Sequence, residues 1–270
     1  NYRAVDSGYL LYAYSGDTCG GDKRHYEIWV DADGNVTETG NEFTETGNKN
    51  CAIGRRPETL ASAPGMAREV GEFFANAAHL EAASVPAFIH LARELRAHGA
   101  PRQLVRGAWR ACADEIRHAR ATAALARRFG SVPRRPHVGR QPIRSLFDVA
   151  SDNALEGCVR ETLGAAVAFA QARSAADPMV RRALAPIARD EARHAQLSWA
   201  VAAWAESRLR PRERRQLRDQ RAQAAASVKR ESEVAWSPAL QRVAGMPSVD
   251  GSMRLLQGLE DRLFTKRLSA

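Results

Sequence analysis

The segment with the clearest chemical content occurs twice in the sequence. "ADEIRHAR" occupies residues 113–120, and "RDEARHAQ" occupies residues 189–196. On a helix, residues three apart lie on one face, so the glutamate and the histidine of each copy project together. The two pairs are Glu115 with His118 and Glu191 with His194. Because carboxylates and imidazoles are both metal ligands, the repeat predicts a metal site to which two helices contribute.

Small and apolar residues accompany both pairs on the same helical stripe. The neighbours are Ala111, Cys112, Ala119 and Thr122 in the first copy, and Ile187, Ala188, Ala195 and Ser198 in the second. Such a stripe faces a core, where a carboxylate or an imidazole without a partner is costly. The alternative, a solvated helix face with internal ion pairs, does not explain why both pairs fall on the apolar side. The repeat therefore predicts two metal ions in a helical core.

A dinuclear site in a four-helix bundle needs one more glutamate from each remaining helix. In the first long helical segment the candidate is Glu81, which lies on a stripe of small and apolar residues. The third segment offers two candidates. Small residues follow the stripe through Glu161, whereas the stripe through Glu156 includes Asp152 and Arg160. We therefore choose Glu161 as the ligand and keep Glu156 as the alternative.

Helical periodicity predicts four long helices that carry these residues. They cover residues 69–99, 101–130, 151–176 and 179–209. A stretch rich in proline and arginine separates the second helix from the third, and its length suits a crossover along a bundle. Asp177 is the expected N-cap of the fourth helix. Further helices are predicted at 211–234, with a basic amphipathic pattern, and at 251–264.

The first part of the chain has a different pattern. "YEIWVDADGNVTETG" alternates apolar with polar residues and turns at Asp33 and Gly34, which is typical of a β-hairpin. The sequence therefore predicts three parts: a small β-rich N-terminal module, a helical bundle and a C-terminal helical extension. Their predicted bounds are 1–60, 66–207 and 208–270.

The four cysteines fall in two settings. Cys19 and Cys51 lie in the polar N-terminal part and are candidates for a disulfide, which would favour an extracytoplasmic location such as the periplasm, the cell envelope or the medium. Cys112 and Cys158 lie in helical patterns, where we predict buried free thiols.

Composition limits the range of partners. The chain has 270 residues, 44% of them hydrophobic, and a net charge of +9 that is carried almost wholly by arginine. Most of these arginines alternate with apolar residues at helical spacing, which favours solvated helix faces over a nucleic-acid surface. Charged residues interrupt every alanine-rich run, so we expect no membrane span. A homo-oligomer is compatible with this pattern.

Residues 70–205 resemble the ferritin-like family of dinuclear carboxylate proteins. The family's order of Glu, Glu-x-x-His, Glu and Glu-x-x-His is matched here by Glu81, Glu115/His118, Glu161 and Glu191/His194. The resemblance implies a mainly α fold: a ferritin-like four-helix bundle with a long crossover, here with the β-rich module and extra C-terminal helices. In related proteins an aspartate before the second glutamate orients a histidine of the opposite helix. Asp114 would then serve His194, and Asp190 would serve His118.

The resemblance also implies an activity. Two iron ions, or alternatively two manganese ions, would react with dioxygen or peroxide, as in a di-iron oxidase or oxygenase acting on a small molecule. A manganese catalase, a ferroxidase or metal store, and a non-catalytic metal-binding scaffold with a basic partner-binding surface are the alternatives. All five tyrosines lie in the N-terminal part, which disfavours a radical-forming reductase subunit.

Overall fold

The computed structural model describes residues 2–5, 8–15, 23–31, 36–45, 70–139 and 141–260. The chain divides into two compact units, Asn1–Cys51 and Ala52–Ala270. The prediction of a mainly helical chain with a small β part is confirmed. Within the described residues, no helix combines the length and the apolar character that crossing a membrane requires.

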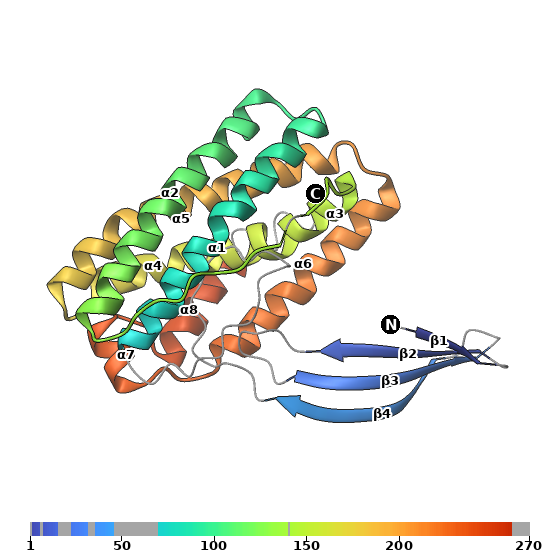
Figure 1. Ribbon diagram of the computed structural model, residues 1–270, viewed down its shortest axis with the longest axis horizontal. Coiled ribbons are helices and arrows are strands. Elements are labelled where there is room, and N and C mark those ends of the chain that lie inside the picture. The colour runs from blue at the N-terminus through green and yellow to red at the C-terminus, as the bar shows by residue number, and fades with distance from the viewer. Residues whose placement is uncertain are drawn as a thin grey trace. The chain divides into compact units, whose positions relative to one another are not determined.

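The N-terminal unit is an antiparallel sheet whose strands follow one another in chain order (Figure 1). Its strands are β1 (Tyr2–Val5), β2 (Gly8–Ser15), β3 (Lys23–Asp31) and β4 (Val36–Glu45). β3 and β4 pair with Val30 opposite Val36, on either side of the predicted turn. Asp33 and Gly34 themselves lie outside the described residues.

The first two long helices form a hairpin. They are α1 (Val70–Ala97) and α2 (Arg102–Arg128), and they pack along each other's length. Gly99 adopts a φ of 70° in the turn between them, a conformation that suits glycine. Pro86 lies inside α1, and both helices end close to their predicted limits.

The second hairpin begins with a helix of mixed geometry. α3 (Leu146–Asp152) passes into a π-helical segment, η1 (Asn153–Glu161), and then into α4 (Thr162–Ser174). The helix starts at Leu146, earlier than predicted, because the Ser145 side chain caps it by accepting from the amide of Asp148. α5 (Pro178–Glu206) packs against η1 and α4, and the predicted N-cap Asp177 is confirmed, since it accepts from two amides of the first turn.

The crossover between the hairpins follows α1, as the trace between α2 and α3 in Figure 1 shows. Nδ1 of His79 lies 3.1 Å from the carbonyl oxygen of Arg134, and Nε2 of His98 lies 2.8 Å from that of Arg144. The guanidinium of the same Arg144 also donates to both carboxylate oxygens of the fully buried Glu94 on α1, at 2.9 and 3.0 Å. The crossover is therefore fixed to α1 by polar contacts at both ends.

The C-terminal helices are α6 (Pro211–Ser232), α7 (Pro238–Val243) and α8 (Val249–Leu259). α6 and α8 pack on the second hairpin, and α7 contacts α1. Arg160 of η1 donates to both carboxylate oxygens of Glu231 on α6, each at 3.0 Å. α7 was missed in the sequence because its six residues are too few to show a helical period.

The apolar core is split into two clusters. One contains Phe74, Leu125 and Ile187, and the other contains Phe88, Ala111 and Val201. On α1 and α2, Glu81 and the first copy of the repeated motif lie between the positions of the two clusters. These polar residues therefore lie in the interior between the two clusters.

Candidate metal centre

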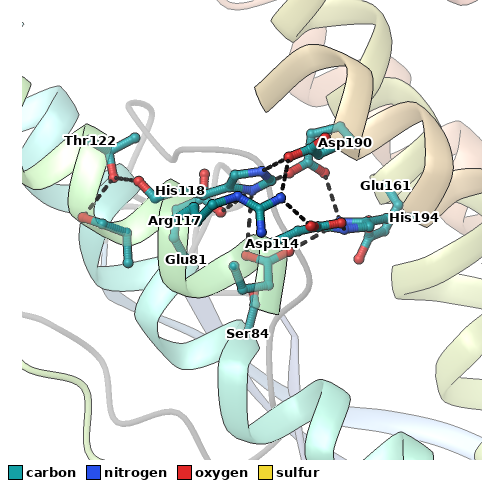
Figure 2. Close-up of polar contacts among 12 residues, drawn as sticks. Glu81, Ser84, Asp114, Arg117, His118, Thr122, Glu161, Asp190 and His194 are labelled. Atoms are coloured by element: carbon teal, nitrogen blue, oxygen red, sulfur yellow. Dashed lines mark hydrogen bonds and ion pairs between the residues drawn. The ribbon is translucent and has the colours of Figure 1, made fainter. Parts of the chain in front are cut away.

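Six buried side chains meet in the middle of the helical unit. None of these side chains is more than 8% exposed. They are Glu81 of α1, Glu115 and His118 of α2, Glu161 at the end of η1, and Glu191 and His194 of α5. The structure thus brings together the whole set chosen from the sequence, and Figure 2 shows part of it.

Their ligand atoms form two overlapping groups, and within each group these atoms all lie within 4.8 Å of one another. The first group contains Glu81, Glu115, His118 and Glu191, and the second contains Glu161, Glu191 and His194. Each group is of a size and composition that could hold a metal ion. Glu191 belongs to both, so two ions at these positions would be neighbours.

Two of the glutamates lie between the histidines. Glu191 places one carboxylate oxygen 3.1 Å from Nδ1 of His118 and the other 3.8 Å from Nδ1 of His194. Glu115 lies closer to the other histidine: one of its carboxylate oxygens is 3.2 Å from Nδ1 of His194, and the other is 3.9 Å from Nδ1 of His118. These two carboxylates are therefore suited to bridge two cations.

The other two glutamates lie at the flanks. Glu81 approaches Nδ1 of His118 to 3.5 Å, and Glu161 approaches Nδ1 of His194 to 3.9 Å. Glu156, the alternative to Glu161, belongs to neither group. Its carboxylate lies 3.7 Å from the guanidinium of Arg160, and its side chain is 19% exposed.

An aspartate from the opposite helix contacts each histidine. Nε2 of His118 lies 3.2 Å from Asp190, and Nε2 of His194 lies 3.3 Å from Asp114, as the dashed lines in Figure 2 show. Arg117 and Arg193 join the aspartates crosswise. Each arginine contacts the aspartate three residues before it and reaches the aspartate of the other helix, at 3.2 Å and 3.4 Å respectively.

In this arrangement Nε2 of His194 faces Asp114, and Nδ1 faces the glutamates. Burial would raise the pKa of Asp114, but hydrogen bonds from His194 and Arg117 outweigh it and hold that pKa well below its ordinary range. An ionised carboxylate can only accept, so Nε2 of His194 donates. With its proton on Nε2, a neutral imidazole presents the lone pair of Nδ1 to the glutamates.

The electrostatics of the cluster favour a cation. Burial, followed by the nearby carboxylate of Glu81, raises the pKa of Glu115 well above its ordinary value. Burial works to lower the pKa of His118, yet the carboxylates of Glu191 and Glu81 raise it to about 11. Burial would raise the pKa of Glu191, but the two histidines lower it to about 2. Without a bound cation, protons on Glu115 and on the imidazole of His118 therefore balance the negative charge of the cluster; bound metal ions would take their place.

Several buried polar atoms of the cluster make no hydrogen bond within the described residues. They are one carboxylate oxygen each of Glu81 and Glu115, and Nδ1 of both histidines. These nitrogens lie at ion-pair distances from carboxylate oxygens, 3.1 Å from Glu191 for His118 and 3.2 Å from Glu115 for His194. Buried polar atoms are normally satisfied, and a cation bound among these nitrogens and oxygens would satisfy them.

Small and weakly reactive groups line the remainder of the site. Thr122 donates to the carbonyl oxygen of His118 at 2.8 Å, and the ring of Phe88 packs 5.1 Å from that of His194. Cys112 and Cys158 are buried thiols outside any disulfide, as predicted. Burial, followed by the charge of Glu115, raises the pKa of Cys112, which disfavours a thiolate.

The sequence prediction of the site missed the π-helical geometry that precedes Glu161 and the contacts of Asn153 and Gly157 with α5. A lone buried asparagine beside a glycine is too weak a signal to indicate them. The Cys19–Cys51 disulfide that the sequence suggests lies outside the described residues.

No family model, no curated protein and no solved structure matches this chain.

Proposed function

We propose that residues 66–207 form a ferritin-like four-helix bundle with a dinuclear metal centre, that the ions are iron, and that the protein is a di-iron oxidase or oxygenase. The β-rich module (1–60) and the helical extension (208–270) complete the proposed organisation. The observation that carries the proposal is the pair of overlapping ligand groups that share Glu191.

The residues divide naturally between two ions. Glu81 and His118 would hold one ion, and Glu161 and His194 would hold the other. Glu115 and Glu191, which lie between the histidines, would contact both. Carboxylates and imidazoles without thiolates suit iron or manganese, so two manganese ions are the alternative.

Bound iron would supply the redox chemistry with dioxygen or peroxide. The chain supplies the surroundings. Asp114 and Asp190, each in contact with Nε2 of one histidine, would hold the imidazoles in one tautomer and one orientation. The burial of all six side chains keeps water from competing for them.

The first experiment is anaerobic loading with ferrous iron, followed by elemental analysis and by exposure to air. We expect two irons per chain and an oxygen-dependent absorption band. Glu191→Ala should abolish iron binding, because both groups lose a member, whereas Glu156→Ala should retain two ions. Two ions in Glu191→Ala would refute the proposal, and two manganese ions in the purified protein would redirect the chemistry to peroxide.

A second candidate function is a scaffold that binds an anionic partner. α6 favours it, because Arg212, Arg215 and Arg230 are exposed on this helix. In that case, salt-sensitive binding to the partner should survive Glu191→Ala. A ferroxidase is intermediate between the two candidate functions: it would turn over ferrous iron at the metal centre with no organic substrate present.

A further inference from the structure

The helix that carries Glu161 departs from α geometry immediately before this residue. η1 covers nine residues and ends at Glu161. π-Helical geometry is rare and usually short, and it changes the angular position of each residue that follows it. A one-residue change of register rotates a side chain by about 100° around an α-helix. The orientation of Glu161 toward His194 therefore depends on the geometry of η1.

α5 contacts η1 closely at one point. The side-chain amide of Asn153, a fully buried residue, donates to the backbone carbonyl oxygen of Ser198 at 2.9 Å. A Cβ on Gly157 would lie 2.7 Å from Oγ and 2.8 Å from Cβ of Ser198, and 2.6 Å from the side-chain oxygen of Asn153. Ser198 lies one turn after His194 on α5. The contact thus links η1 to the helix that carries the second histidine.

The segment is also joined to α6. Arg160, the residue before Glu161, donates to both carboxylate oxygens of Glu231, and Ser151 of the preceding α3 donates to Gln220 at 2.8 Å. η1 is therefore held by a buried contact with α5 and by an ion pair with α6.

We infer that Asn153 and Gly157 are positioning residues, which fix the register of η1 against Ser198 and thereby place Glu161 for the second metal ion. The inference rests on the proposed dinuclear centre. It predicts weaker binding of one metal ion only, because Glu161 belongs to the second ligand group and not to the first. A general loss of stability would weaken both positions.

The test is an anaerobic titration with ferrous iron alone, with elemental analysis of the folded protein. Gly157→Ala should bind one iron per chain tightly and the second at least about 10-fold more weakly, the range found when groups that orient ligands are removed. Asn153→Ala and Glu161→Gln should likewise bind one iron tightly and the second more weakly.

Two variants control for the size of the side chain. Gly107→Ala is the matched control, because its new Cβ would meet only the flexible end of Leu197, at 2.8 Å, between α2 and α5. It should bind two irons. Adding Ser198→Gly to Gly157→Ala removes two of the three crowded atoms and should restore much of the affinity for the second ion.

The outcomes separate this inference from the proposed function. If the wild type binds two irons and both Gly157→Ala and Asn153→Ala also do so with unchanged affinities, the positioning role is wrong and the centre stands. Equal weakening of both ions in these folded variants would also overturn it. If the wild type binds no iron, the dinuclear centre itself is wrong and the inference falls with it.

Discussion

At the scale of single residues, Asp114 and Asp190 decide how the histidines are presented. Each accepts from an imidazole of the opposite helix and contacts both arginines. The positive charges of Arg117 and Arg193 reduce the electrostatic cost of placing the carboxylates of the two aspartates near four glutamates. In the proposed centre, the repeated Asp-Glu-x-Arg-His would act as one unit, in which the aspartate and the arginine orient the histidine that binds the metal.

Replacing either aspartate by asparagine should weaken metal binding without unfolding the chain. An amide can donate to Nε2, and the imidazole proton would then move to Nδ1, where it opposes ligation. For Asp114→Asn or Asp190→Asn we expect about a 10- to 100-fold loss of metal affinity. Equilibrium titration measures it. Asp177→Asn on the same helix as Asp190 is the control, because asparagine caps helices as well as aspartate does; unchanged affinity in both test variants would contradict this role.

At the scale of elements, the contact between Glu94 and Arg144 connects the crossover to α1. Burial would raise the pKa of Glu94, but the Arg144 guanidinium holds it below its ordinary value. A carboxyl whose folded-state pKa is lowered stabilises the protein above its unfolded-state pKa. That contribution is lost as the pH falls through the folded-state value.

Glu94→Gln should therefore destabilise the protein at neutral pH and matter less in acid. Removing one partner of a buried ion pair leaves the other poorly compensated, so we expect a loss of about 3 kcal/mol at pH 7. Denaturant unfolding of wild type and variant between pH 7 and pH 3 measures it, and the difference should shrink below pH 4.5, the ordinary pKa. Asp219→Asn, at an exposed position of α6, should show little difference at any pH. A difference that grows in acid would contradict the assignment.

The elements also show how far the sequence could predict the structure. Periodicity indicated the long helices, because each buries a stripe of small and apolar residues along its length. It favoured Glu161 over Glu156, and the structure groups Glu161 with His194. Periodicity could not indicate η1, because the π-helical geometry is associated with a tertiary contact between Asn153 and Ser198. The crossover contacts of His79 and His98 were missed for a similar reason: their partners are backbone carbonyls, which no side-chain pattern indicates.

At the scale of the whole molecule, the candidate centre draws side chains from four helical segments, α1, α2, η1 and α5. Ions bound there would contact α1, α2, η1 and α5 together. Anything that binds the folded state and not the unfolded chain stabilises the folded state by mass action.

Manganese(II), an air-stable probe, should raise the thermal midpoint of the wild type. At a free concentration of about 100 times the dissociation constant, one site adds about 2.7 kcal/mol. Differential scanning calorimetry measures the shift, which Glu191→Ala should remove. An equal shift in that variant would show that the ions bind elsewhere.

The position of Glu191 in the chain has a consequence for biosynthesis. Both groups that could hold an ion include this residue, and it lies on α5, the last segment in the chain that carries a member of either group. While the protein is being made, α1 and α2 leave the ribosome first with Glu81, Glu115 and His118, and the group to which they belong stays incomplete until α5 emerges. Metal insertion should therefore follow the synthesis of the second hairpin, so that newly made chains pass through a metal-free stage before the centre can form.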